Sequence, residues 1–208
     1  MPRPKNQTQR RAELVATTSR LLVDRGAAGA RLTDIAEAAG LTPASVSYYY
    51  PNLIDLYAET TSTAVAEYVT ARRAHVEAVD DAVPKLRECL RLGIPVQGEP
   101  SFDATVLLLE IAALSTRNQG FDESSDFFLD AELQLFEEVI QAGVDAGIYS
   151  PAHGTAHVAR VLLAIEDGLS ITIIRGALSP RVALDTILTA ASTLVGHDVT
   201  LSAAEPNS

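Results

Sequence analysis

Residues 32–56, LTDIAEAAGLTPASVSYYYPNLIDL, restrict the possible folds of this chain more than any other stretch. The apolar residues before Gly40 fall on one face of a short helix, which Thr33 could cap. Gly40 stands where a helix can end in the left-handed conformation without a Cβ penalty. Thr42 and Pro43 fit the N-cap and the first position of a second helix. The stretch therefore predicts two short helices joined by a tight turn, with a longer helix directly after them.

The second of these helices has two faces of different character. Val46 and Tyr50 are four residues apart, so both can pack inward. The outward face would carry Ala44, Ser45, Tyr48 and Tyr49. Small residues and hydroxyls on such a face suit entry into the DNA major groove, because bulky side chains would hold the helix away from the base edges. The pattern is typical of a helix-turn-helix that binds DNA.

Around these motifs the sequence resembles the TetR family of bacterial transcriptional regulators. The residues that carry the resemblance are Arg25-Gly26, the run 32–43 and the run 48–52, within a match over roughly residues 10–56. The resemblance implies an all-α protein with an N-terminal three-helix DNA-binding head. A long helix would join this head to a helical domain for ligand binding and dimerisation.

Domain and helix boundaries follow from this resemblance and from the spacing of apolar residues. We expect a DNA-binding head over residues 1–51, a second domain over residues 52–201, and a flexible tail over residues 202–208. Glycine and proline breaks separate the apolar patterns and so mark where helices end. The expected helices outside the helix-turn-helix cover residues 10–25, 52–79, 84–92, 101–114, 122–146, 155–178 and 180–195.

Two positions depart from the family pattern. Ser47 stands where the family usually has a tyrosine, and Leu53 where it usually has a lysine that contacts phosphate. Phosphate contacts supply much of the affinity for DNA and its salt dependence. Either the site is weaker than usual, or cations near the N-terminus replace the lost contacts, namely Arg3, Lys5, Arg10 and Arg11. The residues expected to contact DNA are Thr33, Thr42, Ala44, Ser45, Ser47, Tyr48, Tyr49, Arg10 and Arg11.

The charge of the chain is unevenly distributed. Residues 1–52 contain seven basic and four acidic residues, a net charge of +3, whereas residues 53–208 carry −14. A basic head on an acidic remainder is the asymmetry expected when only one end of a protein approaches a polyanion. The alternative is that acidic charge keeps the second domain soluble, which would explain most of the −14.

Composition bears on the compartment of the protein. No apolar run reaches the roughly 18 residues of a membrane-spanning helix, and residues 1–7 lack the apolar core of a signal peptide. The single cysteine, Cys89, cannot form an internal disulfide. No neighbouring cysteine could resolve an oxidised thiol, so Cys89 fits an inert buried thiol better than a redox sensor. We expect a cytoplasmic protein.

The last two expected helices carry the most extensive apolar surfaces. Residues 155–178 are apolar on nearly all sides, and residues 180–195 form a regular amphipathic stripe. In TetR-like proteins the last two long helices form the dimer interface, and the resemblance implies this role here. The alternative is that both stripes only close the core of one monomer. The expected interface residues are Leu162, Leu169, Leu184, Ile187, Leu188, Ala191, Leu194 and Val195.

The resemblance also implies a ligand pocket enclosed by the middle helices. A small-molecule site is mostly apolar, with a few polar groups that fix the orientation of the ligand. The candidates are Tyr68, His75, Cys89, Phe102, Leu109, Glu110, Phe127, Phe128 and Glu166. For any one aromatic residue, packing in the core is the more common role. An exposed helix position is the more common place for Glu110.

The motifs that accompany enzyme activity are missing from the sequence. It has no Gly-rich phosphate loop, no Cys-x-x-Cys and no G-x-S-x-G motif. His153 and His157 have a spacing that can place two metal ligands on one helix face, but Gly154 intervenes and no acidic or cysteine partner lies nearby. We therefore expect no enzyme activity, no cofactor and no metal.

Together these features favour a ligand-responsive transcriptional regulator, most simply a repressor. It would bind a palindromic operator in double-stranded DNA as a homodimer, and a small-molecule effector would release it. The alternative is a helical small-molecule carrier, or a regulator whose DNA binding is weakened or lost. Ser47 and Leu53 leave this alternative open, because they are the changes expected where phosphate contacts are weakened.

Overall fold

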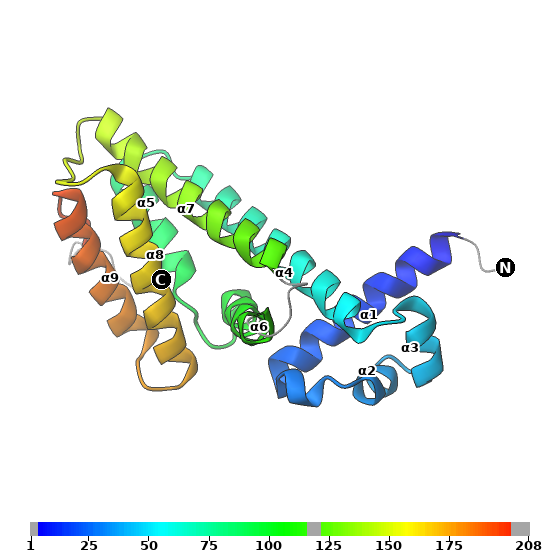
Figure 1. The fold of residues 1–208 in the computed structure, drawn as a ribbon. Helices are drawn as coiled ribbons and strands as arrows, with labels where there is room; N and C mark the ends of the chain where they lie inside the picture. Colours follow the sequence, from blue (N-terminus) through cyan, green and yellow to red (C-terminus); the bar gives the residue numbers. More distant parts are fainter. Residues whose placement is uncertain (1–3, 116–121, 201–208) are drawn as a thin grey trace. The chain divides into compact units, whose positions relative to one another are not determined.

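The computed structural model describes residues 4–115 and 122–200, and it confirms an all-α fold for this part of the chain (Figure 1). The elements are, in order, α1 (Pro4–Arg25), a 3-10 turn (Ala27–Gly29), α2 (Leu32–Ala38), α3 (Pro43–Tyr49), α4 (Leu53–Glu77), α5 (Ala82–Gly93), α6 (Pro100–Ser115), α7 (Asp122–Asp145), α8 (Thr155–Ile174) and α9 (Pro180–Val195). The expected tail at residues 202–208 lies outside the described residues. Within the described ranges, no helix combines the length and the apolar character needed to cross a membrane.

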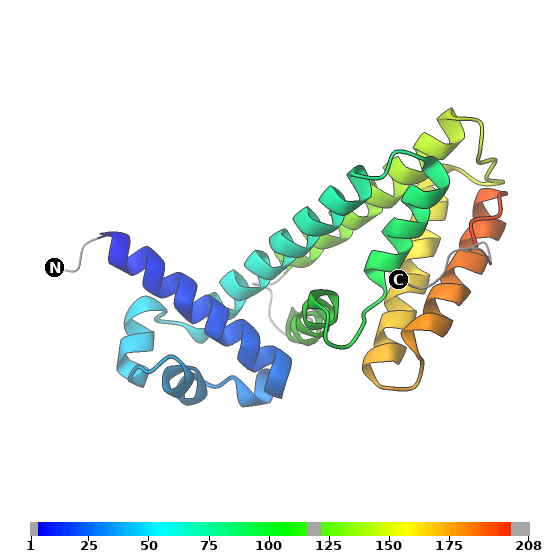
Figure 2. The ribbon, with the colours of Figure 1, turned by 180° about the vertical axis from the view of Figure 1, so that it is seen from behind.

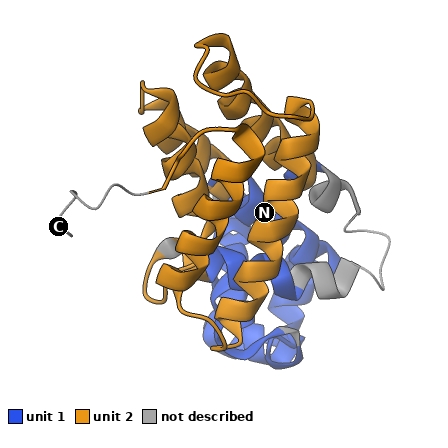
Figure 3. Cartoon of the chain, turned by 90° about the vertical axis from the view of Figure 1, so that its left-hand side faces the viewer, with its two compact units in different colours: residues 1–67, 103–128 blue, residues 68–102, 129–208 orange. Residues whose placement is uncertain are grey.

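The chain is organised as two compact units (Figure 3). Unit 1 comprises residues 1–67 and 103–128, and unit 2 comprises residues 68–102 and 129–208. Helix α4 therefore contributes its first part to unit 1 and its last part to unit 2. The functional division into a head that ends at residue 51 and a ligand-binding domain beyond it stays a prediction.

The turn between α2 and α3 has the conformation that the sequence predicts. Gly40 has φ of +65°, which residues with a Cβ rarely adopt, so α2 can end within a single residue. Thr42 is the N-cap of α3, and its Oγ1 accepts a hydrogen bond from the backbone N–H of Ser45 at 3.1 Å. Pro43 occupies the first helical position, where its missing N–H costs no hydrogen bond.

The start of α2 differs from the prediction. Its N-cap is Arg31, and Thr33 lies inside the helix rather than capping it. The carboxylate of Asp34 accepts a hydrogen bond at 3.1 Å from the backbone N–H of Arg31. This carboxylate satisfies the backbone N–H of the N-cap residue, and the helix begins two residues earlier than a Thr33 cap would allow.

One apolar core holds unit 1 together. Helix α1 contributes Leu14 and Leu22, which are completely buried. Ile35 and Val46 bring α2 and α3 into the same core, and Leu107 of α6 joins it as well. Helix α6, which begins 47 residues after α4 does, thus contributes to the apolar core of unit 1.

Helices α8 and α9 lie side by side within unit 2, as seen from both directions (Figures 1 and 2). Ser179 caps α9, and its Oγ accepts a hydrogen bond from the backbone N–H of Val182 at 3.4 Å. The predicted bounds of α9, residues 180–195, are those of the structure. Helix α8 ends at Ile174, four residues before the predicted end.

The predicted dimer residues on these two helices mostly face the core of their own chain. The fully buried members have at most 2% of their surface exposed and are Leu162, Ile187, Leu188, Ala191 and Val195. The half-buried members, Leu169, Leu184 and Leu194, pack against the same core. The five buried residues pack in the core of their own chain, and the dimer interface stays a prediction.

Candidate functional site

Helix α3 presents to solvent the face that the sequence predicts. Val46 and Tyr50 are buried, with 0% and 2% of their surfaces exposed. Ala44 is exposed, and 61% of the Tyr48 surface is accessible. Ser45 lies beside Ala44, and its hydroxyl is 2.9 Å from that of Thr42. The outward face of α3 therefore carries small residues and hydroxyls at its N-terminal end and a phenol near its C-terminal end.

Tyr48 has neighbours that limit its motion. Its ring packs edge-on against Tyr49, with ring centroids 5.2 Å apart and an angle of 85° between the planes. Its hydroxyl accepts a hydrogen bond from Gln7 Nε2 of α1 at 3.3 Å. The phenol is thus exposed but held on two sides, an arrangement suited to meeting a rigid surface such as a DNA groove.

The two departures from the family pattern have different surroundings. Ser47 is half-buried on α3. Leu53 is half-buried and packs against the apolar core of unit 1. An apolar residue at position 53 thus contributes to packing at the start of α4, where a lysine would have presented a charge to solvent.

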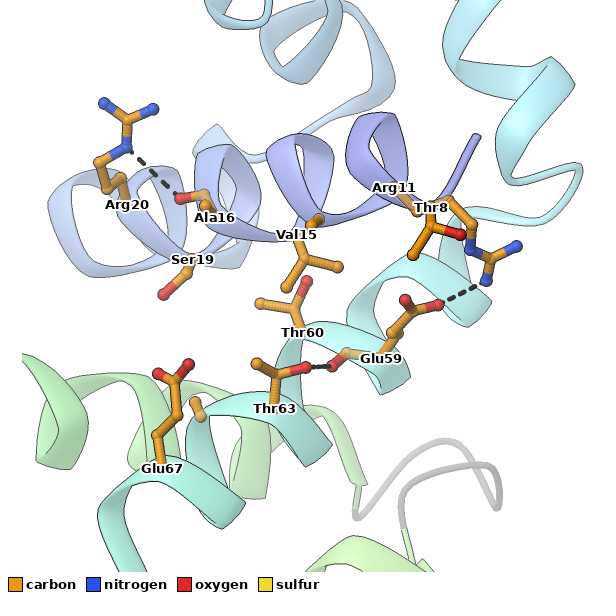
Figure 4. A pocket seen from close by; sticks show the side chains of 12 residues that line it. Thr8, Arg11, Val15, Ala16, Ser19, Arg20, Glu59, Thr60, Thr63 and Glu67 are labelled. Atoms are coloured by element: carbon orange, nitrogen blue, oxygen red, sulfur yellow. Dashed lines mark hydrogen bonds and ion pairs between the residues drawn. The ribbon is translucent and has the colours of Figure 1, made fainter. Parts of the chain in front are cut away.

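Both arginines expected to contact phosphate are ion-paired within the protein. Arg10 pairs with Glu13 of the same helix at 2.6 Å. Arg11 pairs with Glu59 of α4 at 2.5 Å, as the dashed line in Figure 4 marks. The side chain of Lys5 and the whole of Arg3 lie outside the described residues. A phosphate would have to compete with Glu13 or Glu59 for these guanidinium groups.

Comparison with known proteins decides the family of this helix-turn-helix. Residues 14–60 match the family model described as bacterial regulatory proteins, tetR family. The chain carries a TetR-family DNA-binding domain. The match covers α2, α3 and most of α1, which are the elements that the sequence pattern assigned to DNA binding. No curated protein matches the sequence.

Solved structures share the fold along nearly the whole chain. A TetR transcription regulator from Haloarcula marismortui is 25% identical, with a TM-score of 0.75, over 91% of this chain and 97% of that one. A TetR-family regulator from Rhodococcus sp. is 21% identical, with a TM-score of 0.73, over 90% and 99%. A protein from Saccharomonospora viridis described as a transcriptional regulator, in complex with choline, is 23% identical, with a TM-score of 0.80, over 92% and 97%. These structures show that the chain has the fold of TetR-type regulators along nearly its whole length.

A buried charged cluster lies in the interior of unit 2. Its centre is Arg72 of α4, with its side chain only 1% exposed. The guanidinium donates to both carboxylate oxygens of Glu166 in α8, at 2.8 and 2.7 Å, and to the carboxylate of Glu132 in α7. It also donates to the backbone carbonyl of Cys89 in α5 at 2.7 Å and to the hydroxyl of Tyr68 at 3.2 Å. One side chain thus links four helices.

The cluster has an unbalanced charge, and two of its buried polar atoms lack a hydrogen-bond partner within the described part of the chain. One guanidinium faces two carboxylates, so the group carries an excess negative charge when both are ionised. Among the described residues, Glu132 Oε1 and Arg72 Nε are buried without a hydrogen-bond partner. Burial raises the pKa of Glu132 to about 7, although Arg72 opposes the shift. The cluster therefore takes up a proton near neutral pH.

A glycine at the end of α5 leaves room for the Glu166 carboxylate of this cluster. Gly93 ends α5, and a Cβ placed on it would lie 2.0 Å from Cδ of Glu166. Any larger residue would displace that carboxylate. The ring of Phe136 lies on the other side, with its centroid 5.1 Å from the Arg72 guanidinium carbon. Carboxylate, aromatic and backbone groups thus surround a single cation.

The structure brings together three of the predicted pocket residues, Tyr68, Cys89 and Glu166, around Arg72. Cys89 is buried and its pKa is raised to about 12 by burial, as expected for an inert thiol. His75 is exposed, and its Nδ1 lies 2.7 Å from the Ala71 carbonyl of its own helix. The structure does not bring it to Arg72, which lies on the buried stripe of α4.

The remaining pocket candidates have varied surroundings. Phe102, in unit 2, is half-buried. In unit 1, Phe127 is 55% exposed, while Leu109 and Phe128 are half-buried. Glu110 is also half-buried rather than exposed, and its carboxylate oxygens lie 3.3 Å from the position that a Cβ on Gly26 would take.

Sequence reasoning missed Arg72 and Glu132, although their positions show a usable pattern. Arg72 lies four residues after Tyr68 and four before Val76, on the buried side of α4. Glu132 lies four residues before the buried Phe136 of α7. A charged residue in register with a buried stripe is the sign of a buried polar group.

The two histidines considered as metal ligands are both exposed. The rings of His153 and His157 are 5.1 Å apart between centroids. Within residues 4–115 and 122–200, no group of three histidine, cysteine or acidic side chains is arranged to hold a metal ion.

The two faces of α3 can be tested by paired substitutions. Val46→Asp should unfold the head, because it buries an unpaired charge in the core of unit 1. Tyr48→Ala should leave the melting temperature nearly unchanged and weaken DNA binding. Thermal melts followed by circular dichroism, together with titration of duplex DNA, measure both effects. A lower melting temperature for the Tyr48 change than for the Val46 change would reverse the assignment of faces.

The raised pKa of Glu132 predicts a pH dependence of stability. The folded protein holds a proton on Glu132 that the unfolded chain releases above its ordinary pKa of 4.5. The free energy of unfolding should therefore fall as pH rises from about 4.5 to about 7, by up to about 3 kcal/mol. Glu132→Gln should remove this contribution, whereas Glu137→Gln, at an exposed position of α7, should retain it. Urea unfolding at pH 5, 6 and 7 measures the difference, and identical slopes for all three proteins would exclude the proton on Glu132.

Proposed function

We propose that this protein is a ligand-responsive transcriptional repressor that reads its operator with the outward face of α3. The observation that carries the proposal is the exposure of Ala44 and Tyr48 on a helix whose opposite face, Val46 and Tyr50, is buried. A helix in this position of a helix-turn-helix enters the major groove. Thr42 and Ser45 place hydroxyls at its N-terminal end, where base edges and phosphates are within reach.

The effector in this proposal is a small molecule that binds in unit 2. The charged cluster around Arg72 supports this, because buried groups without partners can be satisfied by a ligand. The related fold from Saccharomonospora viridis, in complex with choline, is consistent with small-molecule binding by such a protein. Effector and operator would favour different conformations, so each would weaken the binding of the other.

The operator-binding form in this proposal is a homodimer, because a helix-turn-helix commonly reads a two-fold site as a dimer. In this proposal the dimer interface lies on the outward sides of α8 and α9. Helix α8 exposes the small residues Ala156, Ala164 and Gly168, and Ile171 is 44% exposed. On α9, Val182 is 42% exposed. Small residues allow close approach of a partner helix, and the two apolar side chains supply area to bury.

The function is tested by selecting genomic DNA fragments with the purified protein. A regulator should retain a short set of fragments, protect a palindrome within them, and lose affinity steeply as salt is raised. Fragments from beside its own gene would identify neighbouring genes, and these suggest candidate effectors. Each candidate is then tested for release of the bound duplex. If no fragment is retained even at low salt, the regulator proposal fails and a small-molecule carrier becomes the better explanation.

The dimer is tested by placing a charge on the outward side of α8. Ala164→Arg should convert the dimer to a monomer in sedimentation at micromolar concentration, because two like charges would meet near a two-fold axis. Ala142→Arg, at an exposed position of α7, is the matched control and should leave the mass unchanged. A monomeric wild-type protein would contradict the proposed dimer directly.

A further inference from the structure

The guanidinium of Arg11, on α1, contacts α4 and the C-terminal end of α3. Arg11 belongs to α1, and its Nη2 pairs with Oε2 of Glu59 in α4 at 2.5 Å. Its Nη1 donates to the backbone carbonyl of Tyr49, the last residue of α3, at 3.4 Å. Its Cζ lies 4.3 Å from the centroid of the Tyr50 ring, directly after α3. All four residues belong to unit 1.

These contacts suit the chemistry of an arginine. The planar guanidinium can stack on a ring and donate to two acceptors at once, which a lysine ammonium cannot do with the same geometry. A cation beside the C-terminal end of α3 also interacts favourably with the helix dipole and with the carbonyls that lack a partner in the last turn. The hydrogen bond to Glu59 raises the pKa of Arg11, as expected for a guanidinium paired with a carboxylate.

The position of Arg11 differs from that of other arginines on α1. Figure 4 shows Arg11 reaching from α1 towards Glu59 of α4, at the edge of a groove of about 680 Å³ between the two helices. Arg20 borders the same groove but bonds to Ala16 and Thr17 of its own helix. Arg10 pairs with Glu13, also within α1. Arg11 is the member of this set that joins α1 to α3 and α4.

We propose that Arg11 is a positioning residue for DNA recognition, which fixes the recognition helix α3 between α1 and α4 and makes no phosphate contact of its own. Only residues 50–52 separate α3 from α4, so the direction of α3 depends on how its C-terminal end is held. A small rotation there would move Ala44 and Tyr48 relative to the base edges. Arg11 therefore acts on sequence discrimination through α3.

The competing role, a direct phosphate contact, makes opposite predictions. If Arg11 bound phosphate, removal of Glu59 would free the guanidinium and raise the affinity for DNA. If Arg11 positions α3, removal of Glu59 would loosen the contact and lower discrimination between sequences. A phosphate contact also contributes about 0.9 to the slope of log affinity against log salt, whereas a positioning contact contributes nothing.

The experiment uses the full-length protein, a duplex selected by it from a random library, and a scrambled duplex of the same composition. Arg11→Ala and Glu59→Ala should each reduce the affinity ratio of selected to scrambled duplex by about tenfold, comparable to the discrimination of one base contact. The salt slope on the scrambled duplex should stay unchanged. Arg11→Lys should keep the slope and fail to restore the ratio. Measurement well below each melting temperature keeps loss of folded protein out of the ratio, since unfolding lowers the binding of both duplexes equally.

The matched controls are Arg10→Ala and Glu13→Ala. They remove one basic and one acidic charge from the neighbouring ion pair on α1. Both should leave the ratio within about twofold of the wild type, because this pair lies within one helix. Three results would each overturn the proposal: a higher affinity of Glu59→Ala for both duplexes, a salt slope reduced by about one unit in Arg11→Ala, or an unchanged ratio in both variants. Amide hydrogen exchange in α3, measured without DNA, should rise in Arg11→Ala and Glu59→Ala, and no change there would also contradict the positioning role.

Discussion

A buried arginine that must satisfy two carboxylates constrains the interior of unit 2. Arg72 donates to side chains or carbonyls of α5, α7 and α8 as well as to Tyr68 of its own helix. Charges removed from water are tolerated only when they are paired and hydrogen-bonded, so these helices must keep their positions while the cluster is intact. Loss of one partner would leave a buried charge without compensation. Packing of apolar residues alone would permit small shifts between helices, whereas this geometry favours discrete arrangements.

The head uses an arginine in a similar way but in a different environment. Arg11 also joins three helices, yet its side chain and that of Glu59 are partly exposed, by 44% and 37%. An exposed ion pair contributes little to stability, typically up to about 1 kcal/mol. Its contacts to the end of α3 can therefore set direction without holding the fold together. Helix α4 carries both a residue of the buried cluster, Arg72, and the partner of Arg11, Glu59, on one continuous helix. A change in the cluster thus has a covalent route to the residue that positions α3.

Local features of the fold were predictable because short-range chemistry determines them. The left-handed Gly40, the Thr42 cap and Pro43 decide the turn between α2 and α3, and all three act within a few residues. The inward Val46 and Tyr50 follow from helical spacing alone. The start of α2 was placed two residues too late, because the carboxylate of Asp34 binds the backbone N–H of Arg31 and so supports a start at Leu32.

The interior site was only partly predictable because its partners are distant in sequence. Arg72 meets Glu132 and Glu166, which are 60 and 94 residues away, and a helical arginine is normally expected at the surface. Tyr68, Cys89 and Glu166 were predicted through resemblance, whereas the cation that brings them together was not. Apolar and aromatic residues attract attention in a search for a pocket, and the charged residues in register with them are easily assigned to solvent.

The faces of α8 and α9 show why an amphipathic pattern cannot by itself identify a partner surface. A monomer core and a dimer interface both exclude water, so they select the same residue types. The most regular stripe, on α9, closes the core of its own chain, and Ile187 and Ala191 are completely buried there. What remains available to a second copy is the less conspicuous face of α8, where Ala164 and Gly168 are small enough for close helix contact. A surface built from small residues buries less area per residue than leucines do, so in the proposed dimer the exposed Ile171 would exclude water from its centre. The sequence pattern points first to residues buried within their own chain, and the proposed interface lies on the face that the pattern leaves over.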